Sequence, residues 1–86
     1  MADEVKIGEV IKFFAKPSVA AIKIMDRELA VGDKLHFVGH TTDFEDTVTS
    51  MQIENVSVQK ATPGDLVGIK VKDRVREKDE VFKIIA

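Results

Sequence analysis

The stretch from Ala61 to Lys72 reads ATPGDLVGIKVK and joins a turn to a strand pattern. Its run Pro63-Gly64-Asp65 is typical of a turn, because proline fixes φ, glycine tolerates positive φ and aspartate hydrogen-bonds nearby backbone. After the turn, Val67, Ile69 and Val71 alternate with small or charged residues. Because successive side chains of a strand point to opposite faces, these three share one face. The stretch therefore predicts a turn that leads into a half-buried β-strand.

The same two-residue period recurs on both sides of this stretch. Six strands are predicted: Val5 to Phe14, Val19 to Met25, Lys34 to Gly39, Thr47 to Val58, Val67 to Lys72, and Val81 to Ile85. No long window keeps the 3.6-residue period of a helix. Short strands separated by turns are typical of sandwiches and barrels, and closing the sheet removes exposed edges. We therefore predict an all-β fold, a small six-stranded closed β-barrel.

Two of these strands carry more detailed predictions. One face of the first strand is expected to hold Ile7, Glu9, Ile11 and Phe13. In the strand from Thr47 to Val58 the alternation slips, which indicates bulges that bend the strand and help the sheet to close. The residues from His40 to Asp46 before it are mostly polar and predict a loop.

Composition limits the classes of function. The chain has 86 residues, which is the size of one domain, and it has no cysteine, which excludes disulfides and thiolate chemistry. Its N-terminus is acidic, and no apolar run approaches the roughly 18 residues of a membrane-spanning helix. We therefore expect a single domain over residues 1–86, with a core at about 5–85, in the cytoplasm and away from membranes. The net charge of −2 argues against general binding of nucleic acid but allows a local basic patch.

Several runs together resemble known domains. They are Val31 to Leu35, Val38-Gly39, Val48 to Ile53, and Ala61 to Ile69. In order and spacing they resemble the translation-protein β-barrel, the second domain of translational GTPases such as elongation factor Tu and initiation factor two. The runs Gly39 to Phe44 and Ser50 to Ile53 are closer still to the C-terminal domain attached to some collagenase-like peptidases. The resemblance covers about Ile7 to Phe82 and implies a barrel.

The resemblance to translation factors implies contact with RNA. In those factors the barrel helps to hold the aminoacyl end of transfer RNA through a glutamate and an arginine near the fourth strand. Gln52 and Asn55 occupy the matching places here, so that charge pair is missing. No G-x-x-x-x-G-K-[ST] run is present, so we expect this chain alone to bind no nucleotide.

The candidate binding residues lie in two segments and at one further position. Lys70, Lys72, Arg74 and Arg76 alternate, so an extended chain would place them on one face, and together with Lys78 they suit roughly 4–5 phosphate contacts. The acidic residues interleaved with them also fit an ordinary solvated loop. The second segment supplies His40, Thr41 and Phe44, and the further position is Gln52. Because Phe13 and Phe14 are adjacent in a strand, one of them must lie outside the core.

No catalytic or metal site is predicted. His36 and His40 lie about 13 Å apart on an extended strand, too far to share one metal ion, so His36 is expected to face solvent. Asp43, Glu45 and Asp46 fit turn chemistry better than a cation site. Without a nucleophile motif or a triad, we predict no enzyme activity and no cofactor.

Three functions remain open from the sequence. The first is a stand-alone translation-factor-like module that contacts transfer or ribosomal RNA, or a translation-related protein. The second is an accessory subunit that docks onto a separately encoded peptidase-like enzyme. The third is an enzyme with an unrecognised site made of carboxylates, among them Glu9.

Overall fold

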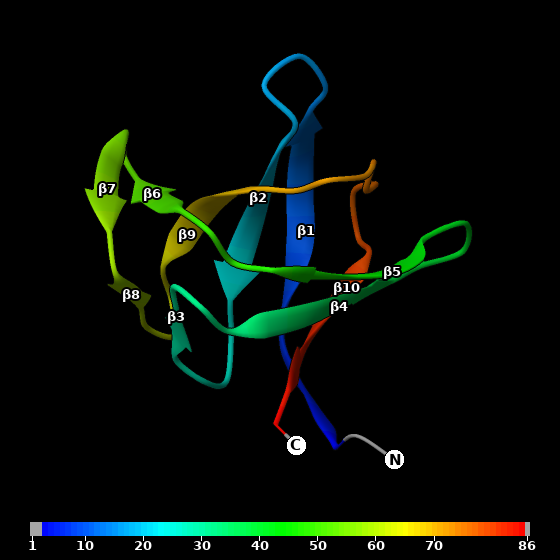
Figure 1. Cartoon of the computed structure of the whole chain (residues 1–86), viewed down its shortest axis with the longest axis horizontal. Coiled ribbons are helices and arrows are strands. Elements are labelled where there is room, and N and C mark those ends of the chain that lie inside the picture. The colour runs from blue at the N-terminus through cyan, green and yellow to red at the C-terminus, as the bar shows by residue number, and fades with distance from the viewer. Residues whose placement is uncertain (1–2, 86) are drawn as a thin grey trace.

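The computed structural model describes residues 3–85, which form ten β-strands and no helix (Figure 1). The strands are β1 (Glu4–Phe14), β2 (Val19–Ile24), β3 (Leu29–Ala30), β4 (Lys34–Val38), β5 (Asp43–Thr47), β6 (Met51–Ile53), β7 (Val56–Val58), β8 (Lys60–Ala61), β9 (Leu66–Lys70) and β10 (Glu80–Ile84). The all-β prediction is confirmed. Within residues 3–85 there is also no helix long and apolar enough to cross a membrane.

Eight of the strands form one antiparallel sheet in the order β5-β4-β10-β1-β2-β9-β6-β7, and β3 pairs separately with β8. The sheet coils, so that β4 and β5 cross in front of β1 in Figure 1. As a result, strands from distant parts of the sheet face one core. Ile22 of β2, Leu35 of β4 and Ile69 of β9 are all buried there, as their alternation predicts.

The prediction of a closed six-stranded barrel is wrong. β5 and β7 lie at opposite ends of the sheet order, and no ladder joins them in the described part of the chain. The chain leaves β5 at Val48, whose N–H donates to Asp33 and whose carbonyl accepts from Gly32, rather than continuing along the sheet. The short β3–β8 ribbon completes the fold at this side, so the core is enclosed without closure of the sheet.

The first strand contains two bulges that the sequence did not reveal. Its register against β10 shifts between Lys6 and Gly8, and its register against β2 shifts between Val10 and Lys12. Each extra residue changes which side chains face inward. Ile7 and Val10 are therefore buried, whereas Ile11 is 41% exposed, so the predicted face of Ile7, Glu9, Ile11 and Phe13 is wrong.

The predicted strand from Thr47 to Val58 is in fact interrupted by a hairpin. Glu54 and Asn55 have φ of 51° and 66°, and two successive positive φ values at a two-residue hairpin loop are typical of a type I′ turn. The apparent slip in alternation is a reversal of the chain from β6 to β7. The predicted loop from His40 to Asp46 also differs, because its second half forms β5 and pairs with β4.

Gly8 provides a test of the packing around the bulged strand. A Cβ at this position would overlap the backbone carbonyl of Lys23 on β2, which cannot move without breaking the ladder. We expect Gly8→Ala to lower the free energy of unfolding by more than about 2 kcal/mol, measured by urea denaturation.

Gly68→Ala is the matched control, because the nearest atom to its added Cβ is a side-chain methyl of Val19 at 3.3 Å. We expect this control to change stability by less than about 1 kcal/mol. Equal losses for the two variants would contradict the packing described for β1.

Candidate functional site

The segment between β9 and β10 is pinned to the β1–β2 hairpin at both ends. The N–H of Val71 donates to the carbonyl of Ser18 at 2.9 Å, and the N–H of Lys78 donates to the carbonyl of Val10 at 2.7 Å. Between these ends, Val75 is 1% exposed and belongs to the core. The predicted loop therefore has a fixed course.

Carboxylates fix the same segment further. The buried Asp79 accepts the backbone N–H of Arg76 at 2.8 Å, and Asp46 of β5 accepts that of Lys72 at 2.8 Å. Because Val75 points inward, its exposed neighbours Arg74 and Arg76 flank it on the surface. The backbone that carries these two arginines is thus held by both the hairpin and β5.

Four of the predicted binding residues meet at one hollow of about 240 Å³. The hollow is lined by Thr41, Thr42, Phe44, Asp73, Arg74 and Arg76. The two predicted segments, the loop after β4 and the basic segment, therefore meet at these residues, although the sequence did not predict that they would lie together. Thr42, which the sequence did not single out, is buried beside it.

The other four predicted residues lie elsewhere. β9 ends at Lys70, so the residues after it are not in a strand and do not continue the face on which Lys70 lies. Lys72 lines a separate hollow with Lys34, Glu45 and Asp46, and His40 lines one with the segment 77–80. Gln52 lines a groove on the outer face of the sheet. The predicted continuous basic face is therefore divided.

Phe44 was expected in a loop, but the structure places it in a strand. It lies in β5, is half-buried, and stacks on the buried Phe37 with ring centroids 5.1 Å apart. Its ring forms a wall of the hollow rather than a free anchor.

The groove that contains Gln52 has a volume of about 450 Å³ and an apolar character. Its floor is low because Ala21 of β2 lies opposite Gly68 of β9. At its sides stand Phe14, which is 43% exposed, and Leu66, which is 53% exposed. The Nζ of Lys12 lies 5.2 Å from the centroid of the Phe14 ring. The sequence showed that one of the adjacent phenylalanines must be outside the core, but not that small residues would make a groove beside it.

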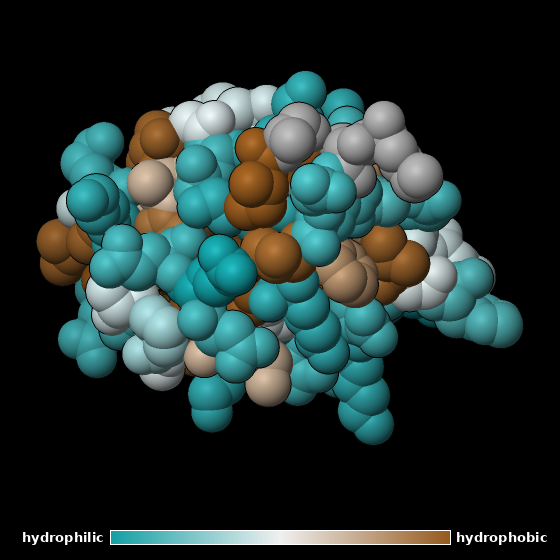
Figure 2. All heavy atoms as spheres, turned by 90° about the horizontal axis from the view of Figure 1, so that it is seen from below, coloured by the Kyte–Doolittle hydropathy of each residue, from teal (hydrophilic) through white to brown (hydrophobic). Residues whose placement is uncertain are grey.

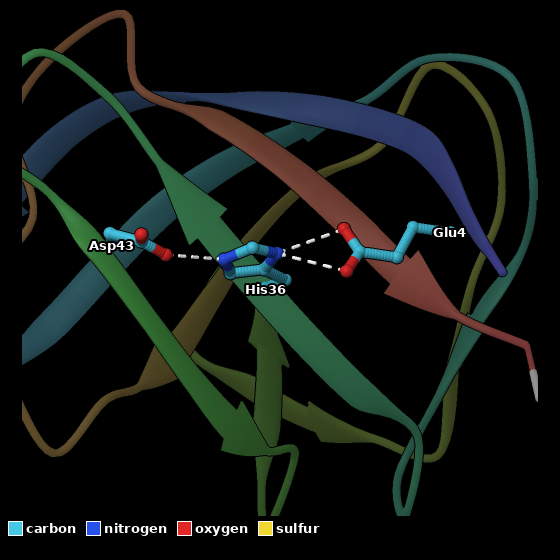
Figure 3. Close-up of polar contacts among 3 residues, drawn as sticks. All are labelled: Glu4, His36 and Asp43. Atoms are coloured by element: carbon cyan, nitrogen blue, oxygen red, sulfur yellow. Dashed lines mark hydrogen bonds and ion pairs between the residues drawn. The ribbon is translucent and has the colours of Figure 1, made fainter. Parts of the chain in front are cut away.

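A polar cluster of three side chains joins three strands (Figure 3). His36 of β4 contacts Glu4 of β1 through Nδ1, at 2.8 and 3.1 Å from the two carboxylate oxygens. Its Nε2 lies 2.5 Å from Oδ1 of Asp43 on β5. The imidazole is partly exposed on the face of β4 opposite to the buried Leu35 and Phe37, so His36 faces solvent as expected, but between two carboxylates that the sequence did not place beside it. Hydrogen bonds that the imidazole donates to Asp43 and, second, to Glu4 raise the pKa of His36 above its usual 6.5.

The raised pKa gives this contact a defined pH dependence. A histidine whose pKa is higher in the folded chain stabilises the fold fully below its unfolded pKa, and that contribution is lost as pH rises through the folded pKa. We expect His36→Gln to lower the free energy of unfolding by about 0.5–1 kcal/mol at pH 5.5, below the usual histidine pKa of 6.5, and by less at pH 9.

Urea denaturation at the two pH values measures this difference. The exposed His40 supplies the matched control, and His40→Gln should leave the pH dependence close to that of the native chain. A loss of stability for His36→Gln that is the same at both pH values would show that charge on the imidazole is not involved.

The carboxylates considered for catalysis are dispersed. Asp43 contacts His36, and Asp46 accepts the backbone N–H groups of Thr47 and Lys72. Glu45 and Asp46 share a hollow of about 260 Å³, but two lysines also line it. Among residues 3–85, no group of three histidine or acidic side chains is placed to hold a metal ion.

Comparison with known proteins relates the chain to peptidases. It is 40% identical, over 92% of its length, to an uncharacterised protease of Methanocaldococcus jannaschii, and 33% identical, over 93%, to a collagenase of Porphyromonas gingivalis. The chain spans about one fifth of these relatives, 19% and 20% of their lengths. No family model matches the chain.

A solved structure shares the fold of this chain. The C-terminal domain of a protein of Geobacillus thermoleovorans, described as a U32 peptidase, superposes with a TM-score of 0.84 at 19% identity. The match covers 90% of this chain and 96% of that domain, and a second crystal structure of the domain gives a TM-score of 0.83. The chain has the fold of that peptidase domain.

These findings separate the two resemblances seen in the sequence. The resemblance to the C-terminal domain of collagenase-like peptidases is confirmed. The assignment to elongation factors and RNA-binding translation proteins is wrong, because the relatives are proteases and collagenases. Glycine-aspartate turns and strand alternation determine a fold, and a fold alone does not specify a partner.

Proposed function

We propose that this chain is a non-catalytic accessory domain that docks onto the peptidase part of a U32-type enzyme. The observation that carries the proposal is the match to about one fifth of full-length proteases and collagenases at 33–40% identity. Asp43 contacts His36, Asp46 accepts two backbone N–H groups, and Glu45 lines a hollow with two lysines, which suits a binding role.

The groove between Phe14 and Leu66 is the surface best suited to this docking. An exposed apolar hollow on a domain of this size marks an interaction site more often than chance exposure does. Figure 2, viewed from the side of the chain ends, shows small apolar areas separated by hydrophilic side chains. The groove instead offers Phe14, Val19 and Leu66 around a floor of small residues.

The register of the strands surrounds this groove with positive charge. Lys12 pairs with Ala21, Lys23 pairs with Leu66, and Lys70 pairs with Val19. Two acidic residues also lie near the groove, Glu9 opposite Lys23 on β1 and Glu54 at the far side, so the three lysines outnumber them. The matching occupant is an apolar surface with acidic residues at its edge, supplied by the remaining four fifths of such an enzyme.

A chimera tests the docking. In it, this chain replaces the matching region of the Methanocaldococcus jannaschii protease, whose other four fifths are kept. We expect amides around the groove to exchange hydrogen more slowly in the chimera than in the isolated chain, because the peptidase part covers them. Leu66→Asp should remove this added protection, since it places a charge in an apolar contact.

Val56→Asp is the matched control, because Val56 is 62% exposed and lies outside the groove. It should leave the protection unchanged. Groove amides that exchange equally fast in the native chimera and in the isolated chain would refute docking through this face.

A further inference from the structure

The hollow between Arg74 and Arg76 contains positive charge that nothing in the fold uses. Within residues 3–85, the ion pairs are those of His36 with Glu4 and Asp43 and that of Lys83 with Asp33. Neither arginine takes part in them. Asp73, which also lines the hollow, accepts the backbone N–H of Arg74 at 2.8 Å. Two guanidinium groups and one carboxylate leave a net charge of +1 in the hollow.

The position of these arginines is set before any ligand arrives. Val75 between them is buried, and the backbone on either side is hydrogen-bonded to Ser18 and Val10. A site whose backbone is already ordered loses less conformational entropy on binding than a mobile loop does. The hollow therefore has the fixed frame that a specific binding site needs.

The remaining walls suit an oxyanion on a short carbon stem. Thr41 and Thr42 add residues with hydroxyl groups, and the half-buried ring of Phe44 adds an apolar side. A guanidinium group presents two parallel N–H donors to a carboxylate, a geometry that lysine cannot supply. The volume of about 240 Å³ is on the scale of one acidic side chain or chain terminus.

A second hollow next to the first suits a flanking residue of the same ligand. It is lined by Phe13, Arg74, Val75, Arg76 and Glu77. The two arginines thus stand between the rings of Phe13 and Phe44, and arginine beside aromatic residues is a composition common in protein-binding surfaces.

The charge pattern favours a peptide over a nucleic acid. Asp73 lines the first hollow and Glu77 lines the second, and both would repel a chain of phosphates. The first hollow alone keeps one positive charge and matches one carboxylate, whereas RNA binding needs a row of cations. Over both hollows Asp73 and Glu77 offset the two arginines, which leaves no excess charge for further anions. We infer that this hollow binds the carboxylate of a peptide, either an aspartate or glutamate side chain or a free C-terminus.

The peptide site and the docking groove lie on opposite faces of β1. Phe13 packs against the core and lines the second hollow, while Phe14 faces the groove. A peptidase part seated in the groove would leave the arginines accessible. The further step, that the hollow presents acidic peptide substrates to the enzyme, rests on the proposed function, but the binding of the peptide does not.

The test is an NMR titration of the full chain at low salt with blocked five-residue peptides that differ only at the central residue. We expect the peptide with central aspartate to shift the backbone amide peaks of Thr41, Phe44 and Arg74 to Arg76. The asparagine peptide should not, because it lacks the charge. The asparagine peptide with a free C-terminus separates a terminal carboxylate from a side-chain one.

The variants Arg74→Gln and Arg76→Gln should each weaken binding of the aspartate peptide about tenfold or more. Arg74→Lys should also weaken it, because the planar donor pair is lost while the charge stays. Lys70→Gln is the matched control: it removes the same charge from an exposed residue outside both hollows and should change the affinity less than twofold.

Equal binding of the aspartate and asparagine peptides would overturn the inference, as would an unchanged affinity in the double variant Arg74→Gln/Arg76→Gln. Single-stranded RNA that binds more tightly than the aspartate peptide would overturn it too. These outcomes are separate from those of the docking test, because Leu66→Asp should leave peptide binding intact and the arginine variants should leave the groove protected in the chimera.

Discussion

The coiling of the sheet depends on the two bulges of β1. Each bulge adds one residue to the strand without adding one to its partner, which bends the strand and increases its twist. Because β1 pairs with both β10 and β2, the bend is passed to each half of the sheet. Leu35 of β4 can then share a core with Ile22 of β2, although β10 and β1 lie between these two strands in the sheet. If the eight-stranded sheet were flat, the face that carries Leu35 and Ile22 would stay in water.

The second bulge also decides which phenylalanine becomes a surface residue. After the extra residue at Ile11, Phe13 lies opposite the buried Ala20 and Phe14 lies opposite Val19. A strand without this bulge would exchange the two faces from Lys12 onward. The apolar groove and the second hollow beside the arginines are thus consequences of the same irregularity, because Phe14 lines the first and Phe13 lines the second.

The sequence predicted the regular parts of this fold and missed its irregular ones. The alternation around Ile22, Leu35 and Ile69 identified core strands, because a half-buried strand requires that pattern. The hairpin at Glu54 and Asn55 was missed, since a type I′ turn usually carries Asn-Gly and this one does not. Bulges leave only a change of phase in the sequence, which a strand break or a turn produces equally well. Closure of the sheet was inferred from the number of strands, although it depends on register.

For the candidate sites, too, the sequence predicted some of the residues but not how the fold brings them together. Thr41, Phe44, Arg74 and Arg76 were predicted as two separate segments, and their meeting at one hollow depends on the hydrogen bond from Lys72 to Asp46 and the burial of Val75. The cluster of His36 with Glu4 and Asp43 was not predicted, because Glu4 is 32 residues away in sequence and reaches His36 only through the sheet. Pairs of this kind follow from strand order, which a two-residue period does not specify.

The contrast between the two resemblances shows which residues bear on function. The glycine-aspartate turns at Gly32 and Gly64 have φ of 99° and 97°, a backbone requirement that any barrel-like fold with such turns shares. They therefore indicated turns between strands without showing which of the two resembling families the chain is similar to. Residues free of such requirements carry more information: Arg74, Arg76, Phe14 and Leu66 are exposed, and the core does not need their side chains. An exposed apolar groove leaves hydrophobic surface in contact with water, which the proposed partner would cover, and the exposed Arg74 and Arg76 carry charge that the proposed anionic ligand would neutralise.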